Sequence, residues 1–132
     1  MKIEPRFLTI SEVIEIHDSE IQAAGGAEGI RDVPGLESAI GAPQASFGGM
    51  HLMDLFDMAA TYVNSIAFNH PFVDGNKRTA LASALTFLYI NGFEVEEEYD
   101  EELADKVLAL LAKTISKQDF AKHFEAHSKS IL

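Results

Sequence analysis

The chain of 132 residues contains no cysteine, and its positive charges are scarce. Without cysteine it has neither disulfide bridges nor metal sites built from thiolates. Ten lysine and arginine residues stand against 21 aspartate and glutamate residues, which gives a formal net charge of −11. This balance repels polyanions, and it argues against general binding to DNA, RNA or an anionic membrane surface. Any site for an anionic ligand must therefore be local.

Long apolar runs are also missing. The opening segment MKIEPRFLTISE has no stretch long enough for a signal peptide or a membrane span, so we expect a cytoplasmic protein. No repeat and no sustained alternation of polar and apolar residues is present, which argues against a sheet. Hydrophobic residues make up 47% of the chain, enough for a real core. The length is that of one domain, which we assign to residues 1–132.

The helical spacing of the apolar residues predicts an all-α fold, a compact bundle of about six helices. Capping residues and turn residues place the helix starts at Thr9 with Glu12 as a capping box, at Asp32, near Leu52 or Asp54, near Gly75 or Asn76, at Asp100, and at Ser116 with Asp119. The fourth of these helices is apolar on nearly every face, so we expect it at the centre. Residues 41–49, between the second and third helices, are expected to form a loop or a short hairpin.

One segment, from His70 to Arg78, combines a histidine, a carboxylate, a glycine, an amide and two cations ahead of an apolar helix. The N–H groups at a helix start bind anions, and Gly75 lets the chain turn tightly enough for them to converge on a phosphate. Lys77 and Arg78 lie in the first helical turn, where the helix dipole disfavours cations. Their presence there indicates that they face an anion. The segment therefore predicts a site for a nucleotide phosphate.

Three polar residues of this segment have candidate roles. Asp74 would repel a phosphate unless a divalent cation lay between them, so we assign it to Mg²⁺. His70 is expected on the rim of the same pocket, where it can take a proton from an attacking hydroxyl as a general base. Asn76 can donate to a phosphate oxygen or cap the helix, and both roles stay open.

Other residues with distinctive side chains are read as structural. Phe72 is expected to be buried beneath the loop and to hold its shape by packing. His17 and His51 are expected to be core histidines with satisfied hydrogen bonds. None of these three residues is expected to touch a substrate.

The segment HPFVDGNKRTAL resembles the signature HPFx(D/E)GNGRxxR of the Fic superfamily, and in particular its death-on-curing (Doc) toxin branch. The resemblance extends upstream through IHDSEIQAAGGAEGIRD and DLFDMAATY, so that it covers roughly Phe7 to Phe93. It implies a Fic/Doc-like fold with a short flap, and ATP with Mg²⁺ as the ligands of the site.

The resemblance also implies a role for each matching residue. His70 would act as the base on a target hydroxyl, and Asp74 would be the Mg²⁺ ligand. Gly75 and Asn76 would form the phosphate-binding loop, and Arg78 would clamp a phosphate. These roles agree with those argued from the residue types alone.

Two positions depart from the Fic signature: Lys77 stands where a glycine is usual, and Leu81 where a second arginine is usual. Most Fic enzymes transfer AMP from ATP to a protein hydroxyl and hold the β and γ phosphates on both arginines, so this chain lacks part of that clamp. The Doc branch shares the Asn-Lys-Arg ending and phosphorylates a translation elongation factor, which blocks translation. The resemblance therefore favours a kinase acting on Ser or Thr. AMP transfer and a non-catalytic phosphate-binding or partner-binding module remain the alternatives.

Partners follow from the same resemblance. The chain has no clear copy of the inhibitory helix motif that many Fic proteins carry, and Doc toxins are inhibited instead by a separate antitoxin whose tail folds into a groove of the toxin. We expect the same type II toxin–antitoxin arrangement. Residues 41–49 resemble the Fic flap, which could dock the target chain by strand addition, and a plain surface loop is the alternative.

Overall fold

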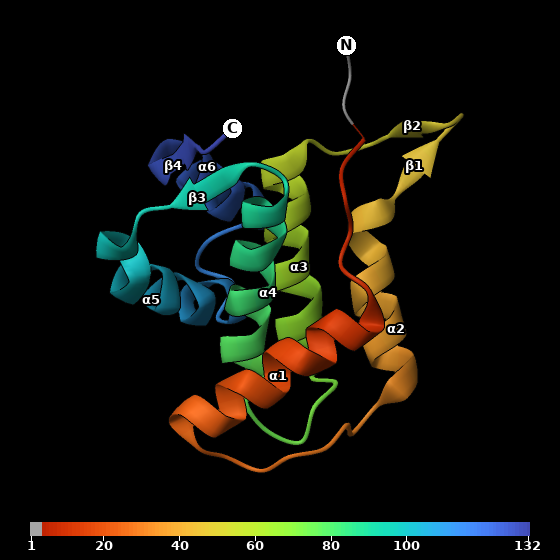
Figure 1. The fold of residues 1–132 in the computed structure, drawn as a ribbon, viewed down its shortest axis with the longest axis vertical. Coiled ribbons are helices and arrows are strands. Elements are labelled where there is room, and N and C mark those ends of the chain that lie inside the picture. Colours follow the sequence, from red (N-terminus) through yellow and green to blue (C-terminus); the bar gives the residue numbers. More distant parts are fainter. Residues whose placement is uncertain (1–3) are drawn as a thin grey trace.

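The computed structural model describes residues 4–132, and this part of the chain is mainly α-helical (Figure 1). The α-helices found there are α1 (Ile10–Ala24), α2 (Val33–Gly41), α3 (Leu55–Asn69), α4 (Asn76–Ile90), α5 (Asp100–Leu111) and α6 (Lys117–His127). Two short 3₁₀ helices, η1 (Ala42–Gln44) and η2 (Glu97–Tyr99), follow α2 and precede α5. The prediction of an all-α bundle of about six helices is confirmed. None of the helices within residues 4–132 combines the length and the apolar character that crossing a membrane requires.

Local capping explains where most of the helices begin. The Thr9 side chain accepts from the Glu12 N–H at 3.2 Å, and the Glu12 carboxylate accepts from the Thr9 N–H at 2.9 Å, which completes the predicted capping box of α1. Asp32 and Asp54 cap α2 and α3, and a second capping box opens α6. The prediction that Asp100 caps α5 is wrong, because Asp100 is the first helical residue and the N-cap is Tyr99, whose side chain makes no capping bond.

Helices α3 and α4 run side by side through the middle of the molecule, and the other helices pack around them (Figure 1). Helix α1 crosses the N-terminal end of α4, α2 lies along α3, and α5 and α6 lie on the opposite side (Figure 1). The largest side chains with no exposed surface come from several of these elements: Tyr62, Phe72, Phe87, Phe120 and Phe124. The prediction that α4 occupies the centre is confirmed, and the loop that joins α3 to α4 is anchored on both core helices.

The region between α2 and α3 contains a short hairpin, as predicted, although it reaches further than residues 41–49. Strands β1 (Ser46–Phe47) and β2 (Met50–His51) pair antiparallel around a two-glycine turn. His51 is only half-buried, and its Nε2 lies 2.7 Å from the carboxylate of Glu4. The prediction that His51 is a core histidine is therefore wrong.

A second pair of strands was not expected from the sequence. Strand β3 (Phe93–Val95) follows α4 and pairs antiparallel with β4 (Ser128–Ser130), which follows α6. Each strand has three residues, too few for the alternation that marks a strand in a sequence. The pairing closes the C-terminal part of the chain onto the end of α4.

The buried hydroxyl of Tyr62 gives a stability prediction at high pH. Tyr62 in α3 has no exposed surface, and its hydroxyl oxygen accepts from the backbone N–H of Leu8 at 3.0 Å. Burial raises the pKa of Tyr62 from 10.0 to about 12. The unfolded chain thus loses this proton at lower pH than the folded protein does, so the free energy of unfolding should fall as the pH rises from 10 to 12.

Urea unfolding of the wild type and of Tyr62→Phe across this range isolates the effect, because the variant should lack this part of the decline. Parallel pH curves for the two proteins would contradict the prediction.

Candidate active site

The loop between α3 and α4 begins with a forced change of backbone direction. His70 takes a left-handed conformation with φ 52° and ψ 52°, and its N–H still bonds to the Ile66 carbonyl at 3.2 Å. Pro71 follows and has no N–H with which to continue the helix. The chain therefore leaves α3 at His70, whose side chain is exposed to solvent.

Phe72 and Asn76 brace the loop from inside. Phe72 has no exposed surface, as predicted, and Asn76 is 4% exposed. The Asn76 side-chain amide makes two hydrogen bonds to the backbone of Phe72. Its oxygen accepts from the Phe72 N–H at 2.9 Å, and its nitrogen donates to the Phe72 carbonyl at 2.9 Å. The helix N-cap is Gly75, so the alternative in which Asn76 caps α4 is wrong. Because its side chain faces the loop, the donor that Asn76 can offer to an anion is its backbone N–H.

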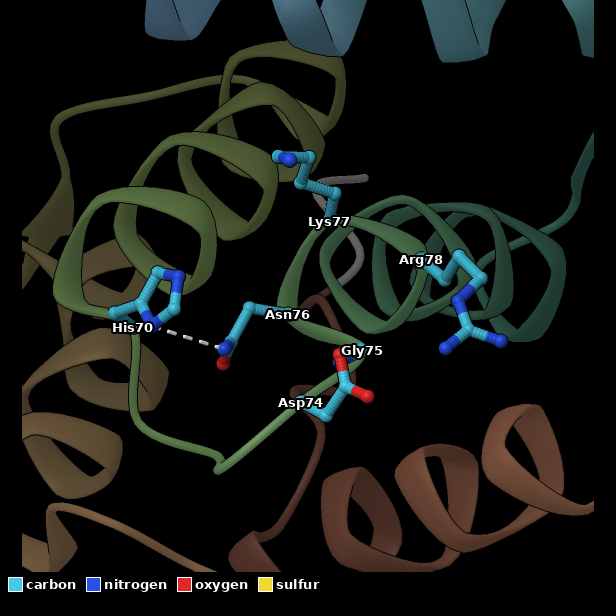
Figure 2. A pocket seen from close by; sticks show the side chains of 6 residues that line it. All are labelled: His70, Asp74, Gly75, Asn76, Lys77 and Arg78. Atoms are coloured by element: carbon cyan, nitrogen blue, oxygen red, sulfur yellow. Dashed lines mark hydrogen bonds between the residues drawn. The ribbon is translucent and has the colours of Figure 1, made fainter. Parts of the chain in front are cut away.

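The orientation of the Asn76 amide also fixes the chemistry of His70. The Asn76 Nδ2 lies 3.2 Å from the His70 Nδ1, and the two bonds to Phe72 show which end of the amide is the nitrogen (Figure 2). Since Nδ2 can only donate, Nδ1 of His70 is the nitrogen that carries the lone pair. The neutral imidazole then bears its proton on Nε2.

Asp74 is exposed, but both of its carboxylate oxygens are oriented by backbone donors. Oδ2 accepts from the Ala27 N–H at 3.2 Å, and Oδ1 accepts from the Gly75 N–H at 2.8 Å. These two bonds lower the pKa of Asp74 below its ordinary value of 3.8, so the group is ionised near neutral pH. Gly26 allows the close approach, because a Cβ there would lie 2.7 Å from the Asp74 Oδ2.

The N-terminus of α4 provides the predicted cradle. The first α-helical bond of α4 runs from the Thr79 N–H to the Gly75 carbonyl at 2.9 Å, so the N–H groups of residues 76–78 have no acceptor within the helix. They border a pocket of about 230 Å³ lined by His70, Asp74, Gly75, Asn76, Lys77 and Arg78 (Figure 2). All six sequence-predicted site residues therefore meet at one pocket that suits an anion.

The two cations of the first turn of α4 behave differently. Lys77 is exposed, and in Figure 2 its side chain points away from that of Arg78. The Arg78 guanidinium donates to the carbonyls of Gly25 at 2.9 Å and Glu20 at 3.3 Å, at the C-terminal end of α1. The dipole of α1 favours a cation there, so the unfavourable position of Arg78 on α4 has an explanation within the fold. No hydrogen bond or ion pair of the Lys77 side chain is found within residues 4–132, so an anionic ligand stays the predicted reason for its position.

A segment that the sequence analysis did not connect with the loop, residues 25–32, holds it from outside. Ile30 and Phe72 form an antiparallel bridge, and the Val73 N–H donates to the Gly29 carbonyl at 3.0 Å. The Arg31 guanidinium donates to the His70 carbonyl from Nε at 2.9 Å, and from Nη2 at 2.5 Å. The glycines of this segment were the available signal, since their turns bring the chain back to the loop.

The donor set allows a magnesium ion but supplies little of its coordination. Within residues 4–132, no group of three or more histidine, aspartate or glutamate side chains is arranged to hold a metal ion. Asp74 alone offers an ionised carboxylate beside the pocket. Mg²⁺ is commonly held by one or two carboxylates, with substrate phosphates and water completing its octahedron. The residues present therefore fit a magnesium ion that arrives with a nucleotide.

Comparison with known proteins identifies the family. The family model described as "Fic/DOC family" matches residues 7–88, which include α1 to α3, the loop and most of α4. The chain belongs to the Fic/DOC family. This member is 40% identical over 116 residues to "Protein kinase doc" of Escherichia phage P1, a match that covers 88% of the chain and 90% of the relative. It is 42% identical over 87 residues to "Toxin Doc" of Mycolicibacterium smegmatis, covering 65% of the chain and 67% of that relative.

Proposed function

We propose that this Fic/DOC protein is a Doc-like toxin and a protein kinase, which transfers the γ-phosphoryl group of ATP to a Ser or Thr hydroxyl of a protein target. The names of the two relatives, a kinase and a toxin, support the class of function. The observation that carries the chemistry is the pocket in which the exposed His70 ring faces the anion cradle of α4. A general base and an anion site on one pocket are what phosphoryl transfer to a hydroxyl requires.

In the proposed reaction the target hydroxyl replaces the Asn76 amide as the hydrogen-bond partner of the His70 Nδ1. Its oxygen attacks the γ-phosphorus, its proton passes to the lone pair on the His70 Nδ1, and the bond to the β-phosphate oxygen breaks to release ADP. The hydrogen bond from the Asn76 amide to His70 is weak, since its length is 3.2 Å, so the target hydroxyl can displace it at little cost. The chain contributes mainly positioning and electrostatic stabilisation.

Charge on the transferring group would be balanced from three sides of the pocket. The backbone N–H groups of residues 76–78 face the phosphates from α4, and Lys77, which also lines the pocket, adds a positive charge. Arg78 adds positive charge from the direction of α1. Asp74 would hold Mg²⁺, which would supply a divalent charge that neutralises the phosphates.

The surroundings of the pocket favour phosphoryl transfer over AMP transfer. A groove of about 230 Å³ lies between α4 and α5. Lys77 and Arg78 line it at the end next to the pocket, and the rest of its lining is apolar: Leu81, Ala104, Val107 and Leu108. If AMP transfer placed the α-phosphate at His70, we infer that the β and γ phosphates would extend past Lys77 and Arg78 toward this groove, where Leu81 offers no charge. An apolar groove takes a base or ribose face more readily than two phosphates. We therefore infer that the terminal phosphate is the one that lies next to His70 in the reaction.

The β1–β2 hairpin is the proposed docking site for the target, which the resemblance suggests is a translation elongation factor. Phe47 and Met50 are cross-strand partners at its tip, and they are 82% and 62% exposed. Exposed apolar side chains on a two-stranded ribbon can bind an extended chain by strand addition. A cognate antitoxin that folds into a groove of this protein is the proposed regulator, and the cytoplasm, where translation occurs, is the proposed location.

Isotope transfer tests the proposal directly. The purified protein, Mg²⁺ and a bacterial lysate or purified translation factors are incubated with ATP that carries its label at the γ or the α position. We expect label in a protein band with γ-labelled ATP alone. Label from the α position would establish AMP transfer instead, and no label from either position would support a binding module without turnover.

A further inference from the structure

A buried imidazole that takes no part in the proposed reaction lies beneath the loop. His17 of α1 is 1% exposed, and its ring stacks on that of Phe72 with centroids 3.9 Å apart and an interplanar angle of 5°. Its Nε2 lies 2.8 Å from the backbone carbonyl oxygen of Asp74. A carbonyl oxygen only accepts, so Nε2 carries a proton and donates it.

This bond determines which way one peptide unit faces. The described chain has no cis peptide bonds, so the carbonyl of Asp74 and the N–H of Gly75 point in opposite directions. With the carbonyl held inward on His17, the Gly75 N–H points outward, where it bonds to the Asp74 carboxylate at 2.8 Å. The opposite orientation would direct a carbonyl oxygen into the anion pocket.

Glycine makes that opposite orientation accessible. Gly75 has φ 75°, and glycine adopts positive and negative φ with similar ease, so rotation of the 74–75 peptide meets little steric resistance from Gly75 itself. The Gly75 backbone also lies close to α1, since a Cβ there would be 3.0 Å from the Ile21 Cδ1 and 3.7 Å from the His17 Nε2. His17 thus contacts a peptide that Gly75 itself does little to restrain.

We propose that His17 is a positioning residue, which locks the Asp74–Gly75 peptide with its carbonyl turned away from the phosphate pocket. The proposal rests on the proposed function for its kinetic consequence. The lock itself is a property of the nucleotide-free protein. His17 acts through the peptide and does not touch the nucleotide.

Two substitutions separate the hydrogen bond from the packing. His17→Phe keeps an aromatic ring against Phe72 but removes the donor, and His17→Gln keeps an amide donor at about the position of Nε2. We expect His17→Phe to raise the KM for ATP in target phosphorylation about tenfold, the usual value of one hydrogen bond, with a smaller change in kcat. His17→Gln should recover most of the loss. Val13→Ala, which removes packing one turn earlier on the buried face of α1, is the control for general destabilisation.

The outcomes that overturn the proposal are distinct. A KM for ATP that is unchanged in His17→Phe, or equally impaired in His17→Phe and His17→Gln, would rule out the lock, as would the same kinetic change in Val13→Ala. Nitrogen-15 NMR of the wild-type histidines needs no variant and no activity. It should find a proton on the His17 Nε2, and an unprotonated Nε2 would overturn the proposal even if a variant failed to fold. Failure of the kinase proposal itself would appear as absent labelling with this Nε2 proton still present.

Discussion

Replacement of His70 by alanine is expected to lower target phosphorylation by about 10²–10⁴-fold, the range that a general base contributes. The same change should abolish growth arrest on expression in a bacterium, because toxicity depends on turnover in the proposed mechanism. The side chain is exposed, so its removal leaves no cavity in the core. Initial rates of label transfer from γ-labelled ATP, measured at saturating Mg²⁺, provide the test.

A histidine away from the pocket provides the matched control. His127 ends α6, and its ring lies against that of Tyr99 with centroids 3.8 Å apart and an interplanar angle of 31°. In Figure 1, α6 lies toward the top of the molecule and α1 at the bottom. His127→Ala should retain its activity per folded molecule. Nucleotide affinity should survive in His70→Ala, since the cradle is formed by α4. Full phosphorylation by His70→Ala would remove the base from the mechanism, and lost affinity with normal kcat would make His70 a binding residue.

Sequence reasoning predicted those parts of the fold that depend on neighbours in the chain. The capping boxes at Thr9 and Ser116 each involve a partner three residues later, so the sequence contains the whole interaction. The pairing of β3 with β4 joins residues 93–95 to residues 128–130, and nothing local in either segment specifies it. Strands this short are determined by where the flanking helices end.

The same distinction separates what was predicted about the site from what was missed. The motif from His70 to Arg78 lies within one loop and one helical turn, so its side chains had to come together at the α4 N-terminus. The bonds that orient the motif come from elsewhere: Arg31 binds the His70 carbonyl, and Arg78 binds carbonyls at the end of α1. Sequence reasoning therefore assigned Arg78 only to an anion, because its protein partners are more than 50 residues away.

The predicted roles of Asp74 and His17 show how one residue can serve two purposes. The Asp74 carboxylate faces the pocket and is the proposed Mg²⁺ ligand, whereas its backbone carbonyl is held from below by His17. A substitution at position 74 removes the carboxylate but keeps the bond from His17 to the backbone carbonyl, because every residue has a carbonyl. Side-chain variants at position 74 therefore test the metal separately from the conformation of the loop.

Asp74→Asn is expected to lower phosphorylation by about 100-fold or more, since a bound metal ion contributes several kcal/mol of charge stabilisation to such reactions. The asparagine oxygen can still accept from the Gly75 or Ala27 N–H, so the loop should keep its shape while the site loses its negative charge. The Mg²⁺ concentration at half-maximal rate should rise strongly in the variant, and chelation of Mg²⁺ should stop the wild-type reaction.

Asp119→Asn, which changes another exposed carboxylate, in the capping box of α6, is the control and should leave the Mg²⁺ dependence unaltered. If Asp74→Asn kept the wild-type Mg²⁺ dependence, another group would have to hold the ion, and the carboxylate would serve only to orient the loop.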